Sequence, residues 1–532
     1  MRPRSARVPA AALAVLLAAG GCSLFQDEPG PEEPARAFVA AWARGDTATA
    51  AAQTDDPAAA RAGLDALRKG LGATSGTVTL GEVTSEGEDN AIARYTAEWV
   101  LPAVAAPWRY DGTLPLVRSD DAWTVQWGPN DLHPKLQTGQ TVRVVRELPE
   151  RAALQDAAGQ PLFRREAVVT VGVEPRRVPD LPALATALAA ALEIDPADVV
   201  ADVRTAKPTA FVPVITLRRA DYEKVKPRIY DLAGTVFQRG ERLLGPSARF
   251  AQPLLGRVGD ATAEVLKEAG DAYRTGDELG VSGLQRALNG QLTGTAGARV
   301  EAVWETPGNR EPVALGQVEG KPGTPVRTTL DRSVQQAADA AVAASTTPTA
   351  LVAVKPSTGA IVAVANNEKA PYDIALAGRF PPGSTFKIVT ASALLTGGVV
   401  QPASAVDCPA TTVVYGKRFQ NSDRFELGRV PLREAFAQSC NTTFTQLSQR
   451  LDDGALAAAA APYGVGSRWQ LPVPSFGGSV PAPKDDTEKA ADAIGQGRVE
   501  VSPLTMALVA AAVAKGGGVV PSLVAGQPAA GA

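Results

Sequence analysis

The chain has 532 residues, 45% of them hydrophobic and 20% charged, and a formal net charge of −3. This length exceeds a single ordinary core and indicates several domains, and the composition is typical of globular proteins. The charge shows no basic surplus, so we expect no nucleic-acid partner. There is one histidine, and neither CxxC nor HExxH occurs, so we also expect no metal and no cofactor.

The first 22 residues predict a secretory signal, with arginines before an apolar stretch too short to span a bilayer. The ending LAAGGC is similar to a bacterial lipobox, which makes Cys22 the candidate acylated residue; an ordinary signal peptide cut nearby is the alternative. Residues 23–33 are acidic and proline-rich, as in a tether. We therefore expect the protein at the extracytoplasmic face of the cell membrane, held by a lipid anchor. Cys408 and Cys440 could pair in such an exported protein.

Residues 34–140 predict a compact α+β domain. The segment 34–57 has the spacing of a short amphipathic helix that buries Phe38, Val39 and Trp42. Stretches with strand character follow, separated by turn residues. No group of titratable side chains stands out, so a binding or spacer role is favoured.

Residues 141–325 predict a connecting and docking region. The segment 180–200 has the pattern of a helix opened by Asp180 and followed by a proline-containing exit. TAFVPVITLRR has the pattern of a strand, and a glycine-rich stretch leads into a further amphipathic helix. GxGxxG after a strand and GxxxxGK[ST] are both absent, which argues against nucleotide binding.

The remaining chain begins with a predicted helix over 331–345 and a hairpin over 349–366. The segment 433–451 has the pattern of two helical pieces around a polar Ser-Cys-Asn. A glycine-rich loop and an alanine-rich helix follow over 494–518.

The stretch FPPGSTFKIV (380–389) combines a serine and a lysine three residues apart. Two prolines and a glycine do not fit inside a helix, whereas STFKIVTASALL does, so Ser384 should lie at the first positions of a helix. Free N–H groups and a partial positive charge there stabilise an oxyanion. Lys387 lies on the same face, and burial that lowers its pKa would let it accept the Ser384 proton. Taken alone, the pattern also fits a helix cap followed by a solvated lysine.

His133 is the only imidazole in the chain and stands in NDLHPKL, far from Ser384 in the sequence. We expect it to be a structural polar residue before Pro134. The base of any nucleophilic catalysis is then not a histidine.

Further motifs accompany FPPGSTFK: SCN about 55 residues later and AIGQG about 55 beyond that. With them the chain resembles the class B penicillin-binding proteins, the peptidoglycan transpeptidases. WGPNDLHPKL is similar to the end of their NTF2-like extension, and YRTGDELGVSGLQRALNGQLTGTAG to the close of their dimerisation domain. ERAALQDAAGQPL is similar to their RGxIxDRNGxxLA motif, with departures at Ala152, Ala153, Gln155, Ala157 and Ala158.

The resemblance implies a multidomain α+β fold. Its expected parts are an NTF2-like domain, an elongated dimerisation or pedestal domain, and a partial transpeptidase domain of the serine β-lactamase and D,D-peptidase type. The expected bounds are a signal peptide with lipobox at 1–22, a linker at 23–33, and domains at 34–140, 141–325 and 326–532.

The resemblance also implies roles for site residues. Ser384 would be the acylated nucleophile and Lys387 its base. Ser439 would relay the proton to the leaving group, and Asn441 would bind the substrate amide while contacting Lys387. The Ser384 backbone N–H would supply half of the oxyanion hole. Cys440 would be the variable middle residue, packed inward and not a nucleophile.

A third family element, a strand carrying Lys-[Thr/Ser]-Gly, does not occur after Asn441. In the family this strand holds the substrate carboxylate and supplies the other oxyanion N–H, whose loss costs roughly a hundred- to a thousandfold in rate. We therefore expect a poorly active chain from a truncated reading frame or fragment, with an open edge beside the 349–366 hairpin.

The implied function is a D,D-transpeptidase that cross-links peptidoglycan stem peptides through an acyl-Ser384 intermediate and is acylated by β-lactams. Stem peptides, β-lactams, the membrane and cell-wall synthesis proteins are the expected partners. One alternative is a non-catalytic wall-associated lipoprotein with a decayed third domain. Another is a serine β-lactamase or β-lactam sensor, against which the long N-terminal extension and pedestal argue.

Overall fold

The computed structural model describes residues 30–528 except 74, 121, 307 and 309. The predicted signal and Cys22 lie outside the described residues. The chain divides into two compact units. The first contains the chain up to Pro102 with Ala106–Val145 and Ala298–Val318, and the second contains the rest. Among the described helices, none combines the length and the apolar character that crossing a membrane requires.

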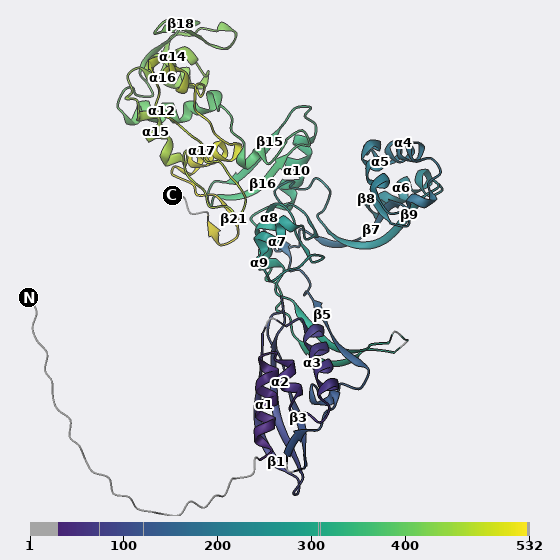
Figure 1. Ribbon diagram of the computed structural model, residues 1–532. Coiled ribbons are helices and arrows are strands. Elements are labelled where there is room, and N and C mark those ends of the chain that lie inside the picture. Colours follow the sequence, from purple (N-terminus) through teal and green to yellow (C-terminus); the bar gives the residue numbers. More distant parts are fainter. Residues whose placement is uncertain (1–29, 74, 121, 307, 309, 529–532) are drawn as a thin grey trace, which may run out of the picture. The chain divides into compact units, whose positions relative to one another are not determined.

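The described residues of the first unit form three α-helices, labelled in Figure 1, and a four-stranded antiparallel sheet in the order β1-β2-β3-β4. The buried positions of β2 alternate, as expected for a sheet with one covered face. Only one helix was expected over 34–57, but both α1 and α2 lie there and α3 begins at Pro57. Their bounds, with those of the strands, are α1 Glu32–Ala43, α2 Thr47–Ala51, α3 Pro57–Leu71, β1 Ser75–Ser85, β2 Asn90–Val100, β3 Trp108–Ser119 and β4 Ala122–Val125.

Helix α3 begins where Asp56 accepts the Ala59 N–H and Pro57 takes the first helical position. A second sheet in this unit has the order β13-β12-β5. Residues 298–318 therefore cluster with the first unit, although we expected 141–325 as one domain. The remaining elements are η1 Pro129–Asp131, β5 Gln140–Glu147, β12 Gly297–Trp304 and β13 Val313–Val318.

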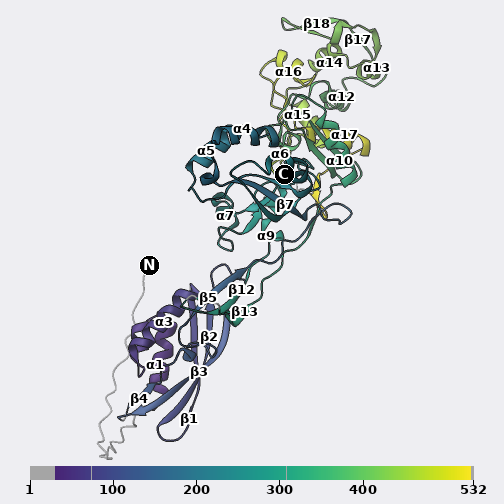
Figure 2. The ribbon, with the colours of Figure 1, turned by 90° about the vertical axis from the view of Figure 1, so that its right-hand side faces the viewer.

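The pedestal part of the second unit has a sheet in the order β8-β7-β9, with α4, α5 and α6 beside it (Figure 2). The helix expected to open at Asp180 is α4, and in its proline-containing exit Glu193 adopts a left-handed backbone. Asp195 then caps a second helix, α5, which was not expected. The bounds are β6 Leu154–Gln155, β7 Arg164–Val173, η2 Pro175–Arg177, α4 Leu181–Leu192, α5 Pro196–Thr205, β8 Val212–Arg218, α6 Arg219–Ile229, β9 Thr235–Leu244, β10 Val258–Asp260, α7 Ala263–Ala269, β11 Glu278–Gly280, α8 Gly283–Ala287 and α9 Asn289–Leu292.

The rest of the second unit is built on a sheet in the order β15-β16-β21-β22. Helix α10 packs against β16, and α17 packs against β15. Its first elements are β14 Val326–Arg327, α10 Arg332–Ala343, β15 Ala350–Lys355, β16 Ala360–Asn366, α11 Ile374–Ala377, η3 Gly383–Phe386 and α12 Lys387–Thr396. These are followed by β17 Ala405–Cys408, β18 Thr411–Val414, β19 Lys417–Gln420, η4 Ser422–Arg424, β20 Gly428–Pro431, α13 Leu432–Ala437 and α14 Asn441–Ser448. The last are α15 Ala455–Ala460, η5 Ala461–Tyr463, α16 Asp486–Asp492, α17 Pro503–Lys515, β21 Ser522–Val524 and β22 Gln527–Pro528.

The hairpin expected over 349–366 is formed by β15 and β16. The second strand is not at an edge, because β16 pairs in parallel with β21. In the part of the sheet that the structure describes, β15 and β22 are the edge strands, and five of the six residues of β15 are half-buried.

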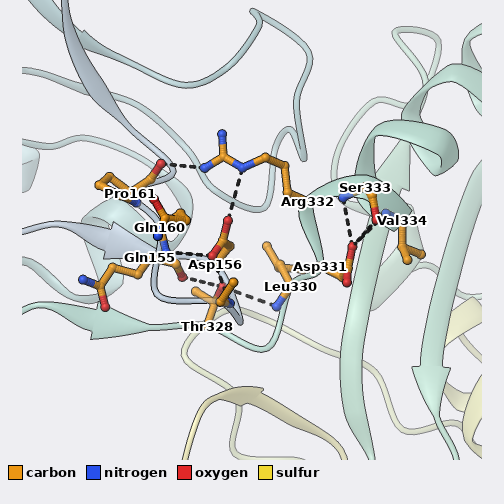
Figure 3. A network of polar contacts seen from close by, with 11 residues as sticks. Gln155, Asp156, Gln160, Pro161, Thr328, Leu330, Asp331, Arg332, Ser333 and Val334 are labelled. Carbon is orange, nitrogen blue, oxygen red and sulfur yellow. Dashed lines mark hydrogen bonds and ion pairs between the residues drawn. The ribbon is translucent and has the colours of Figure 1, made fainter.

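A polar network joins the start of the pedestal to the start of α10 (Figure 3). The buried Asp156 carboxylate accepts the Gln160 N–H at 2.8 Å and pairs with Arg332 at 3.2 Å. Arg332 also donates to the Pro161 carbonyl at 2.7 Å. Beside it, Thr328 donates to the Gln155 carbonyl at 2.8 Å. Asp156 is the acidic residue that ERAALQDAAGQPL retains, and it links the two segments through charge-assisted bonds.

Candidate active site

Ser384 lies in the short 3-10 helix η3, three residues before α-helix α12 begins. We expected it within the first positions of the helix, but α12 itself begins at Lys387. A left-handed glycine, Gly383 with φ 57°, makes the turn, and its N–H donates to the Gly495 carbonyl at 2.8 Å. A Cβ on Gly495 would lie 2.0 Å from the Gly383 carbonyl oxygen, so only glycine fits there. The loop of the GQG motif therefore fixes the turn that carries the exposed Ser384.

Lys387 is the most enclosed charged group of the site, with only 2% of its surface exposed. Its Nζ lies 3.1 Å from Ser384 Oγ, 3.0 Å from Ser439 Oγ, 2.7 Å from the Ser439 carbonyl and 2.5 Å from Asn441 Oδ1. The reach between Lys387 and Ser384 expected from the sequence is thus present. Burial lowers the pKa of Lys387 to about 8, which makes a neutral amine accessible near neutral pH.

Ser439 lies at the end of α13 in an unusual backbone conformation. Its φ is 58°, in the left-handed region that glycine normally occupies after a helix. The Ser439 N–H donates to the Phe436 carbonyl at 2.9 Å, and the Cys440 N–H donates to the Ala435 carbonyl at 2.8 Å. This pair of bonds is a Schellman motif. The tight turn directs both the hydroxyl and the carbonyl of Ser439 at Lys387.

Asn441 is the first residue of α14 and has both ends of its amide engaged. Its Oδ1 accepts from Lys387, and its Nδ2 donates to the Gln420 carbonyl at 3.0 Å. The next residue is held as well, because the Thr442 N–H donates to Asn421 Oδ1 at 3.1 Å. Gln420 and Asn421, at the end of β19, are site-supporting residues that sequence reasoning missed, since no short motif marks them.

Cys440 is fully buried, as expected, and forms a disulfide with Cys408 at an S–S distance of 2.10 Å. The sequence had left this pairing open. With its sulfur bonded to another sulfur and buried, Cys440 is not available as a nucleophile. Within the described part of the chain, no cluster of three or more His, Cys, Asp or Glu side chains is arranged to hold a metal ion.

His133 belongs to the first unit, whereas Ser384 belongs to the second. Its ring stacks on Trp108 with 5.5 Å between centroids and packs against Tyr110 at 4.7 Å. Its Nδ1 accepts the Lys135 N–H at 3.2 Å. These contacts support the structural role expected for His133.

Chemically, Ser384, Lys387 and Ser439 form a connected proton path, and Asn441 holds the Lys387 amine in place. A neutral Lys387 amine can accept the Ser384 hydroxyl proton, and the Ser439 hydroxyl lies beside the same nitrogen. Free N–H groups in the first turn of a helix favour negative charge nearby, which suits a charge that develops near Ser384. This arrangement suits acyl transfer through a serine ester.

Comparison with protein families gives three matches in chain order. The NTF2-like N-terminal transpeptidase domain matches residues 30–140, the penicillin-binding protein dimerisation domain matches 146–328, and the penicillin-binding protein transpeptidase domain matches 349–528. The chain belongs to the penicillin-binding proteins. The resemblance drawn from FPPGSTFK, SCN and AIGQG is confirmed, and so is the three-domain α+β fold.

Several relatives of this penicillin-binding protein are themselves named penicillin-binding proteins or peptidoglycan D,D-transpeptidases. Penicillin-binding protein 3 of Bacillus subtilis is 22% identical over 81% of this chain and 69% of its own length. The peptidoglycan D,D-transpeptidase PbpA of Mycobacterium tuberculosis is 32% identical over 37% of this chain and 47% of its own length. The peptidoglycan D,D-transpeptidase MrdA of Acinetobacter baumannii is 25% identical over 69% of this chain and 61% of its own length. The alignments thus span between about half and two thirds of these relatives.

Proposed function

We propose that this penicillin-binding protein is a D,D-transpeptidase that cross-links peptidoglycan stem peptides and is acylated by β-lactams at Ser384. The observation that carries the proposal is the position of Lys387 Nζ, 3.1 Å from Ser384 Oγ and shared with Ser439 and Asn441. A capping serine followed by a solvated lysine would not bury the amine among four oxygen atoms.

The first half-reaction forms an acyl-enzyme. Lys387 accepts the hydroxyl proton as Ser384 Oγ attacks the carbonyl carbon of the donor peptide bond. The backbone N–H of Ser384 stabilises the oxyanion. When the C–N bond breaks, the leaving amine receives a proton from Lys387 through the Ser439 hydroxyl. The second half-reaction reverses these steps, with the amine of an acceptor stem peptide attacking the ester and Ser384 regaining its proton.

Asn441 is proposed to bind the amide of the donor peptide. One N–H of its Nδ2 is used by the Gln420 carbonyl, and the other remains to donate to a substrate carbonyl. Its Oδ1 meanwhile keeps Lys387 in place.

Labelling with a fluorescent penicillin tests the proposal. The protein should acquire a covalent label that Ser384→Ala abolishes, and peptide mapping should place the label on Ser384. Thr385→Ala is the matched control: the neighbouring hydroxyl donates to the Pro382 carbonyl and is expected to be dispensable for labelling. Folded protein with no Ser384-dependent label at high penicillin concentration would contradict the proposal and favour a non-catalytic wall-associated lipoprotein.

We further propose that Cys22 carries a lipid anchor that holds the protein at the extracytoplasmic face of the membrane. The support is the LAAGGC ending and the acidic tether after it. Cys22→Ala should release the protein from the membrane fraction. Retention of the variant in that fraction would show that the cysteine is not the anchor.

A further inference from the structure

The turn that carries Ser439 and Asn441 is attached to neighbouring segments by two contacts that do not involve the side chains of Ser439 or Asn441. The first is covalent, because Cys440 lies between the two residues and is bonded to Cys408 at the end of β17. The second is polar: Asn421 Oδ1 accepts the N–H of Thr442, immediately after Asn441. We call Cys408, Cys440 and Asn421 the turn clamp.

The two ties are themselves connected. Asn421 is fully buried, and its Nδ2 lies 3.4 Å from Cys408 Sγ and 3.0 Å from the Pro409 carbonyl. The Thr442 hydroxyl donates to the same Pro409 carbonyl at 2.7 Å. The first turn of α14 is therefore bound to the chain just after β17 along one continuous set of contacts.

The turn at Ser439 has an unfavourable backbone conformation that needs support from its surroundings. Ser439 holds a left-handed backbone with a side chain present, which is unfavourable outside glycine. Such a conformation persists only where its surroundings over-determine it. If the turn relaxed, both the carbonyl and the hydroxyl of Ser439 would leave Lys387 Nζ, which they approach to 2.7 and 3.0 Å.

We infer that the turn clamp positions Ser439 and Asn441 against Lys387, so that Cys408, Cys440 and Asn421 act on the acylation of Ser384 without touching substrate. The inference rests on the proposed transpeptidase function and adds three positioning residues to it. Its alternative is a disulfide and a buried amide that stabilise the fold alone. The two differ in what they do to Lys387, because only the positioning role alters the surroundings of its amine.

The pH dependence of acylation separates these roles. Loss of the clamp should open the surroundings of Lys387 to water and so lessen the burial that lowers its pKa. The pH range in which the acylation rate rises, called the rising limb of the pH profile, should then move to higher pH. A purely structural change would lower the folded fraction and scale the rate equally at every pH. The second-order rate constant for penicillin acylation should therefore be measured from pH 6 to pH 10.

The central variant is Cys408→Ala with Cys440→Ala, which leaves no unpaired thiol. Acylation should fall about ten- to a hundredfold, since small displacements of catalytic groups have effects of that order, and the limb should move up by about one pH unit. Asn421→Ala should act in the same direction with a smaller effect. Leu451→Ala is the matched control, because Leu451 belongs to the same buried cluster beyond the far end of α14. It should change folded stability and leave the limb in place.

A second readout does not need activity. In protein labelled with 13C-lysine, the Cε resonance of Lys387, assigned with Lys387→Arg, reports its titration midpoint directly. A higher midpoint in the double variant supports the clamp, and an unchanged midpoint together with an unchanged limb overturns it. If the unaltered protein is not acylated at Ser384, the proposed function fails. The titration midpoint of Lys387 in the two proteins still shows whether the clamp affects the surroundings of its amine.

Discussion

Lys387 in the second unit and His133 in the first are two buried bases in very different surroundings. Burial lowers the pKa of Lys387 from 10.5 to about 8 and that of His133 from 6.5 to about 4. Lys387 Nζ has four oxygen atoms around it, among them the hydroxyls of Ser384 and Ser439. His133 has two aromatic rings against it and accepts a backbone N–H. A lowered pKa thus marks loss of water, and the neighbouring groups decide whether it serves catalysis.

The sharpest way to separate the two bases is to replace each. Lys387→Arg keeps a positive charge but cannot accept a proton near neutral pH, so Ser384 acylation should fall about 10²–10⁴-fold. His133→Asn keeps an acceptor for the Lys135 N–H and should leave the acylation rate of the folded protein unchanged. Both rates are measured with fluorescent penicillin and corrected for folded fraction. Equal losses in the two variants would contradict the distinction drawn between these residues.

The pH dependence of acylation is the next test. Because the base must be neutral and the pKa of Lys387 is about 8, the rate should rise about tenfold per pH unit below pH 8 and level off above it. His133 has a pKa of about 4 and stays neutral throughout this range. A second limb near pH 6 to 7 that His133→Asn removes would show that the imidazole takes part after all.

The smallest expected effect concerns stability in the first unit. The folded pKa of His133 lies below its unfolded value of 6.5, so the unfolded chain takes up the proton first. The stabilisation present above pH 6.5 should be lost as the pH falls toward 4, by about 1–3 kcal/mol. The free energy of unfolding of the protein and of His133→Asn should differ by a pH-dependent amount of that size. Tryptophan fluorescence reports mainly on this unit, because only Trp469 of the seven tryptophans lies in the second.

Asp131 also titrates with a shifted pKa, so the unaltered protein has to be compared with His133→Asn. Burial raises its pKa from 3.8 to about 7, so its contribution to stability is present at low pH and lost as the pH rises through 7. That trend opposes the one from His133. Since Asp131 is present in both proteins, the difference between them isolates the imidazole. A difference that stays constant from pH 7 to pH 4.5 would contradict the buried, neutral state of His133.

The local part of the site was predictable from the sequence because it depends on spacing alone. Pro381, Pro382 and Gly383 do not fit inside a helix, so the helix must begin after them. Ser384 and Lys387 are then about one helical turn apart, on the same face. One local detail, the 3-10 conformation at Ser384, was not predicted. The 3-10 start of the helix depends on the bond from Gly383 to Gly495, more than a hundred residues away.

Ser439 and Asn441 were named through the resemblance and not through any local rule. Their turn uses a left-handed serine where the usual sequence signal is a glycine. The contacts of Gln420 and Asn421 join segments about twenty residues apart through backbone carbonyls and one buried amide. Such contacts leave no periodic pattern in the chain, and the same holds for the pairing of Cys408 with Cys440.

By itself, the sequence determined the spacing of Ser384 and Lys387 and, through the resemblance that its motifs carry, the order of the three domains. Motif spacing acts over short stretches of chain. The tertiary structure decided the surroundings of Lys387. Packing brought Ser439 and Asn441 within 3.0 Å of its amine, removed water from around it and lowered its pKa. Desolvation and orientation depend on residues distant in the chain. They distinguish a base that contacts serine hydroxyls from one that packs against aromatic rings.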